Sequence, residues 1–188
     1  MKCIPRLFLV VLACAVAGGA AFAQAQSASW AKPPDVISVS DGTRLLFNTV
    51  SGYLAKSADK VSEEIYAFKP TPEVRTFGQI IAHVAEGNYG MCAAVLGEKT
   101  PVEGLEKSKT TKAELVKAFA DSTAYCQRAF KGLTDANATE LVPFFGQKMA
   151  RVSILDLTSA EAYTHYGNLV TYMRLKGIVP PSSERGPR

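Results

Sequence analysis

Apolar residues recur at the spacing of an α-helix in four separate stretches of this 188-residue chain. We expect helices over about residues 42–67, 76–97, 111–132 and 153–176. No stretch shows the apolar–polar alternation that is typical of a β-strand. Four amphipathic helices without a convincing strand favour an all-α protein, and specifically a four-helix bundle.

The ends of these helices carry their own signals. Residues 76–79 and 111–114 match capping boxes, in which a threonine and a glutamine or glutamate three positions later satisfy the first amides of a helix. Gly177 stands where a C-terminal cap is expected for the last helix. Between the third and fourth helices, residues 135–151 read as irregular, with a turn at 142–146 that covers one end of the core.

A basic start and a short apolar run open the chain. Lys2 and Arg6 precede the uncharged stretch 7–17, and the small residues Ala21 and Ala23 form a cleavage pattern. These features predict a secretory signal peptide over residues 1–23, and hence a periplasmic or secreted protein. No later apolar run is long enough to span a bilayer, so no membrane association is expected after cleavage.

The remainder of the chain has the size of one domain. We expect a flexible leader, a helical bundle and a short disordered tail, over residues 24–39, 40–181 and 182–188. Loss of Lys2 and Arg6 lowers the formal net charge from +4 to about +2. No basic stripe with interleaved aromatic residues is present, so a nucleic-acid partner is not expected.

The chain has two histidines, His83 and His165, and both fall within predicted helices. Glu161 precedes His165 by four residues, which places the two side chains one turn apart on one helix face. A third ligand from another helix, His83, would complete a site for zinc, nickel, iron or manganese. The alternative is an ordinary acid–histidine pair, which is common on helices.

Two segments resemble the DinB family of metal-binding bundles. They are His165–Pro181, which resembles the family's C-terminal motif, and Thr76–Ala85, which resembles its second helix. The resemblance implies a four-helix bundle, often a homodimer, that binds a divalent metal through three histidines. One histidine comes from the second helix and two come from the fourth. On this chain those places are His83, position 161 and His165.

The chain departs from the family pattern at position 161, where it has glutamate. A carboxylate is a competent ligand for the same metals, so a His–Glu–His site is one interpretation. The other is a decayed site. Residues 158–161 match a capping box that would place Glu161 at a helix start. Ser153 and Asp156 would instead cap a longer helix and leave Glu161 in its interior.

These residues lead to two hypotheses of function. The first is a metal-dependent enzyme that acts on a small molecule, in which the ion serves as a Lewis acid or activates a water or a thiolate. The thiol-dependent transfer known in the family suits an exported chain poorly, because small thiol cofactors belong to the reducing cytosol.

The second hypothesis is a non-catalytic bundle that dimerises or binds a small ligand, with a degenerate metal site. Motifs of other catalytic classes are missing from the sequence.

Several neighbouring residues have two interpretations each. Gly87 and Gly90 lie on the helix face of His83, where they either leave room beside the imidazole or allow close helix packing. Asn168 and Tyr172 follow His165 on one stripe, where they either orient a water or substrate or make structural hydrogen bonds.

The cysteines leave a similar question open. Cys92 and Cys126 remain after removal of the signal peptide. They either form a disulfide, which an oxidising compartment permits, or stay as buried free thiols.

Overall fold

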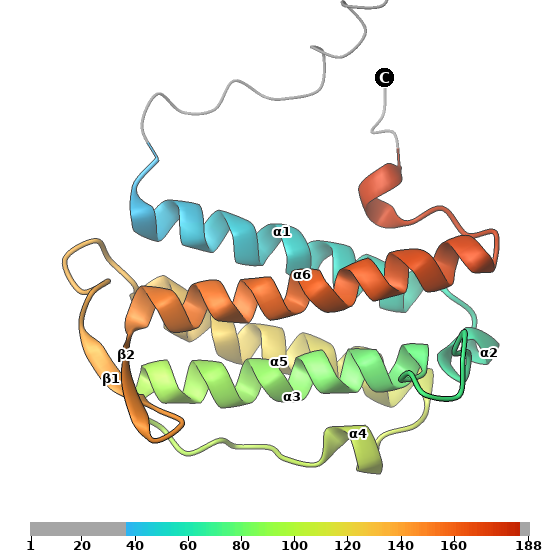
Figure 1. The fold of residues 1–188 in the computed structure, drawn as a ribbon, viewed down its shortest axis with the longest axis horizontal. Coiled ribbons are helices and arrows are strands. Elements are labelled where there is room, and N and C mark those ends of the chain that lie inside the picture. The colour runs from blue at the N-terminus through green and yellow to red at the C-terminus, as the bar shows by residue number, and fades with distance from the viewer. Residues whose placement is uncertain (1–36, 185–188) are drawn as a thin grey trace, which may run out of the picture. The chain divides into compact units, whose positions relative to one another are not determined.

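The computed structural model describes residues 37–184, which are built around four long helices. The four are α1 (Val39–Lys60), α3 (Phe77–Leu96), α5 (Lys112–Gly132) and α6 (Arg151–Leu175). Helices α1 and α3 each pack against both α5 and α6, so α1 and α3 lie diagonally across the bundle (Figure 1). The expected all-α four-helix bundle is confirmed.

Shorter elements connect the four helices. They are α2 (Glu63–Tyr66), α4 (Leu105–Ser108), β1 (Leu141–Phe144), β2 (Gln147–Ala150) and a final 3₁₀ turn, η1 (Pro181–Ser183). The predicted signal peptide and most of the predicted leader lie outside the described residues. Within residues 37–184, no helix is both long and apolar enough to cross a membrane.

The first helix ends earlier than the apolar pattern indicates. It was expected to run to residue 67, but Val61 is extended and Ser62 starts the separate short helix α2. The hydroxyl of Tyr66 donates a hydrogen bond to the carbonyl of Ala58, 2.7 Å away, in the last turn of α1. That buried bond satisfies a carbonyl that a helix end leaves unpaired, and so stabilises the break.

The segment expected to be irregular forms a β-hairpin instead. Its strands pair antiparallel from Leu141 with Ala150 to Phe144 with Gln147. Phe145 and Gly146 make the two-residue turn and both have positive φ, 45° and 78°. Val142 and Phe144 are buried against the bundle, so the prediction that this segment covers one end of the core is confirmed.

Helix α6 begins two residues before the predicted start, and Ser153 does not cap it. Its first amides find backbone partners instead. The amide of Arg151 donates to the carbonyl of Glu140, and that of Val152 donates to the carbonyl of Ala138. Glu161 therefore lies well inside α6, and its interpretation as a residue at a helix start is wrong.

A disulfide joins α3 to α5 through Cys92 and Cys126, which answers the question that the sequence left open. Both sulfurs are buried in the half of the core that the hairpin covers. Phe47 and Phe130 stack there with ring centroids 4.1 Å apart.

Gly78 is the most closely packed of the three glycines in α3, and its replacement by alanine is expected to destabilise the fold. A Cβ at Gly78 would lie 3.1 Å from the backbone oxygen of Tyr66 and 3.1 Å from the side chain of Leu115. Overpacking of this kind costs about 1–3 kcal/mol. Gly90→Ala is the matched control, because nothing lies within 4 Å of its Cβ and alanine favours helix. Equal urea midpoints for the two variants would contradict the prediction.

Candidate metal centre

Helices α3 and α6 bring together the three side chains that the sequence singled out. His83 comes from α3, and Glu161 and His165 come from consecutive turns of α6. One ligand atom from each lies within 4.8 Å of the others. The predicted trio therefore forms one cluster, as the i,i+4 spacing and the packing of α3 on α6 require.

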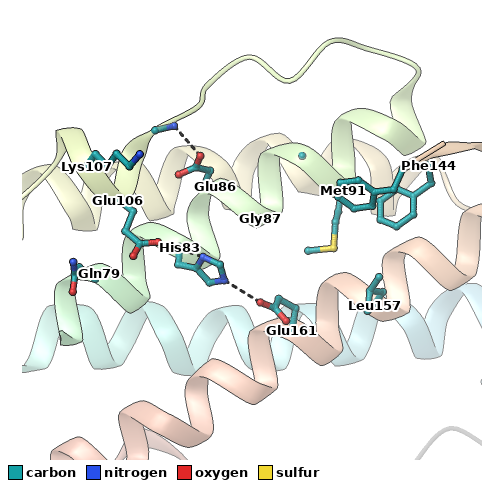
Figure 2. Close-up of a pocket in the computed structure, with 13 residues that line it drawn as sticks. Gln79, His83, Glu86, Gly87, Met91, Glu106, Lys107, Phe144, Leu157 and Glu161 are labelled. Carbon is teal, nitrogen blue, oxygen red and sulfur yellow. Dashed lines mark hydrogen bonds and ion pairs between the residues drawn. The ribbon is translucent and has the colours of Figure 1, made fainter. Parts of the chain in front are cut away.

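Glu161 is the centre of this cluster. Its Oε1 lies 3.2 Å from Nε2 of His83 and 2.8 Å from Nε2 of His165. The two imidazole rings meet edge to face, with centroids 4.7 Å apart. Figure 2 shows the carboxylate of Glu161 directed across the gap between the helices toward His83.

The electrostatics favour a neutral His165 beside an ionised Glu161. Burial lowers the pKa of His165 below its ordinary value, and this outweighs the opposing effect of Glu161. Burial raises the pKa of Glu161, but the charge and hydrogen bond of His165 and the hydrogen bond of His83 together bring it below its ordinary value. Neutral imidazole and carboxylate are the forms that bind a metal.

Glu106 is a member of the site that the sequence analysis missed. Its Oε2 lies 3.5 Å from Nδ1 of His83, and its Oε1 accepts a hydrogen bond from Nε of Arg75 at 3.1 Å. In the tautomer of His83 that binds an ion through Nε2, the proton lies on Nδ1 and faces Glu106. Glu106 belongs to α4, within a polar connection that has no helical period, so no spacing signal pointed to it.

For the glycines and the tyrosine near the cluster, the structure decides between the two interpretations that the sequence left open. A Cβ at Gly90 would meet nothing within 4 Å, and one at Gly87 would meet only the methyl of Met91 at 3.5 Å. These glycines therefore leave room rather than pack closely. Asn168 has its amide nitrogen 3.5 Å from Nδ1 of His165. Tyr172 donates to the carbonyl of Arg75 at 2.9 Å, which is a structural role.

The donor set fits one divalent transition ion. Ligand bonds of about 2.0–2.2 Å place the ligand atoms of one ion roughly 3–3.6 Å apart. Two contacts of the cluster, 3.2 and 2.8 Å, are near that range, and all three ligand atoms lie within 4.8 Å of one another. Two imidazoles and one carboxylate also leave coordination positions for a substrate.

The sequence matches the DinB superfamily over residues 46–169, which span α1 through most of α6. The chain belongs to the DinB superfamily. The family membership expected from the two resembling segments is therefore confirmed, and the cluster lies within the matched region.

Solved structures show the same fold. A DinB-like protein from Bacillus cereus ATCC 10987 is 20% identical, with a TM-score of 0.63 over 74% of this chain and 94% of that one. The DinB-like protein YjoA from Bacillus subtilis is also 20% identical, with a TM-score of 0.60 over 77% of this chain and 99% of the other. No curated protein matches the sequence.

A mycothiol-dependent maleylpyruvate isomerase is a further structural neighbour of this DinB protein. It is 18% identical, with a TM-score of 0.58 over 71% of this chain and 61% of the isomerase. Identity at this level shows a common fold alone.

Proposed function

We propose that this DinB protein is a metal-dependent enzyme that acts on a small molecule, with a divalent ion held by His83, Glu161 and His165. One observation carries the proposal: the three ligand groups converge beside a cavity of about 770 Å³, and His83 and Glu161 line that cavity. Clefts of this size that contain a few convergent polar groups are typical of small-molecule sites.

Each residue of the cluster has a distinct part in such a site. His165 is buried and anchors the cluster on α6, while His83 and Glu161 are partly exposed toward the cavity. Glu106 orients the imidazole of His83 through its Nδ1. A divalent ion bound by the trio would supply Lewis acidity toward a carbonyl or a similar polar group.

We also propose that the protein acts after export. The predicted signal peptide supports this, and so does the disulfide between Cys92 and Cys126, because structural disulfides persist mainly in oxidising compartments. The same argument disfavours a low-molecular-weight thiol as cosubstrate, in spite of the mycothiol dependence of the neighbouring isomerase.

Metal titration tests the proposal. The full chain, purified without a histidine tag and stripped of metal, is expected to bind about one equivalent of zinc, nickel, iron or manganese. His83→Ala should lose that binding, because its imidazole is the one ligand from α3. Uptake of less than about a tenth of an equivalent by the native chain would contradict the proposal. It would identify a non-catalytic bundle in which Glu161 only satisfies two imidazoles.

A further inference from the structure

The cavity beside the metal cluster has two chemically different ends. Along α3, His83, Gly87 and Met91 follow each other at four-residue intervals, and along α6 Glu161 follows Leu157 by four. All five line the cavity. His83 and Glu161 form the polar end of the cavity. Met91 lies on the same face of α3 as His83, Leu157 lies on the same face of α6 as Glu161, and together they form the apolar end (Figure 2). A molecule that reaches both ends therefore needs a polar group and an apolar body.

Two phenylalanines of the hairpin line the apolar end of the cavity. Phe144 and Phe145 both line the cavity, with ring centroids 4.5 Å apart. Phe145 is 90% exposed and has a φ of 45° in a turn position that favours asparagine, aspartate or glycine. The positive φ costs free energy, and the exposed ring contributes almost no burial to offset it; such features gather at ligand sites.

Two glycines keep the α3 wall of the cavity open. Gly87 and Gly90 lie in the middle of a 20-residue helix, where glycine is unfavourable. Neither is required by a close backbone approach, since a Cβ at Gly90 would meet nothing within 4 Å. Their effect is to leave space between the metal cluster and the phenylalanines.

The carboxylates at the polar end are already engaged. Glu86 accepts a hydrogen bond from the amide of Gly104 at 2.8 Å, and Glu106 is paired with Arg75. Glu161 faces the two imidazoles. Gln79 and Lys107 also line the cavity. Toward the hairpin the lining side chains are thioether, leucine and phenyl groups, which select for apolar area rather than for charge.

We propose that this cavity binds a small molecule with an apolar body, aromatic or branched aliphatic. The body lies against Met91, Phe144 and Phe145, and its reacting polar group lies at His83 and Glu161. The polar half of the proposal rests on the metal-dependent function proposed above. The apolar half rests on the hairpin and the glycines and is independent of metal.

The proposal is tested by the binding of two hydroxamic acids to the zinc-loaded full chain. The two share the metal-binding hydroxamate group and differ only in their hydrocarbon part. 4-Phenylbutanohydroxamic acid is expected to bind at least about tenfold more tightly than acetohydroxamic acid, because the phenyl body adds buried apolar area. Gly90→Leu should abolish that advantage by filling the cavity. Gly52→Leu on α1 is the matched control, because nothing lies within 4 Å of its Cβ and it is not among the cavity residues. Equal affinities of the two hydroxamates for the native chain would overturn the proposal.

Phe145→Asn tests the contribution of the Phe145 ring to ligand binding separately from its effect on stability. Asparagine tolerates positive φ, so the variant should unfold at the same or a higher urea concentration than the native chain. The loss of the ring should nevertheless weaken the phenyl hydroxamate about threefold or more and leave acetohydroxamate unchanged. A variant that binds both hydroxamates as the native chain does would overturn the role of the hairpin tip.

A probe without a metal-binding group distinguishes failure of this inference from failure of the proposed function. 4-Phenylbutan-1-ol is expected to bind the metal-free full chain in saturation-transfer NMR, and Gly90→Leu should remove the signal. If the alcohol binds in this way while no metal is taken up, the proposed function fails and the apolar site stands. If metal is taken up but neither phenyl probe binds, the apolar site fails and the metal centre stands.

Discussion

Replacement of Cys92 and Cys126 by alanine is expected to lower the free energy of unfolding by about 3–4 kcal/mol. The bond joins residues 34 apart in sequence, on α3 and α5, and both sulfurs are buried. A cross-link over a loop of this length removes conformational entropy from the unfolded chain, and its loss returns that entropy. Urea unfolding of the native and doubly substituted chains measures the difference.

The single variants supply the control. Cys92→Ala and Cys126→Ala each break the same bond, so each should lose most of the stability that the double variant loses. A peptide pair linked through Cys92 and Cys126 should appear in a non-reducing mass-spectrometric digest. Single-variant effects that add up to the double-variant effect would show that the two cysteines act independently, contrary to the structure.

The helices and the trio were predictable because both depend on local spacing. The capping boxes at residues 76–79 and 111–114 form as their sequences indicate. Glu161 and His165 share a face because any helix that contains both must place them one turn apart. Their approach to His83 needed the family resemblance in addition, since spacing alone does not say which helices are neighbours.

The hairpin was not predictable by the same reasoning. Its first strand has four residues and contains Pro143, which weakens the strand signal, and its turn places phenylalanine where asparagine is usual. The alternation of exposed and buried residues exists but is too short to stand out. Local rules failed at the part of the chain that lines the cavity, which is where function competes with folding preference.

Glu106 could not be found from the sequence, and the disulfide could not be decided from it, for a different reason. The position of Glu106 depends on how the α3–α5 connection folds back onto α3, through contacts such as the hydrogen bond from Gly104 to Glu86. The disulfide depends on the packing of α3 against α5. The disulfide closes this connection between α3 and α5, and α4 lies inside the closed loop. A cross-link outside the cluster therefore restrains the segment that brings Glu106 to His83.

Glu161→Gln is expected to weaken metal binding by at least about a hundredfold, which is the upper end of the loss seen when a residue behind a ligand is changed. Glutamine keeps the shape of the side chain and one acceptor oxygen but replaces the anionic carboxylate ligand with a weakly donating neutral amide. Glu161→His should retain affinity within about tenfold of the native chain, because it restores a third nitrogen ligand of the kind the family resemblance implies. Competition against a chelating dye gives the three affinities.

Glu86→Gln is the matched control for this series, since Glu86 lines the same cavity on α3 and its amide replacement can still accept from Gly104. It should bind metal as the native chain does. Native affinity in Glu161→Gln, together with loss of binding in His165→Ala, would remove the glutamate from the ligand set and leave a two-histidine site. A hundredfold loss in Glu161→Gln with unchanged urea stability assigns the carboxylate to the ion, because a glutamate that only satisfied two imidazoles would affect folding instead.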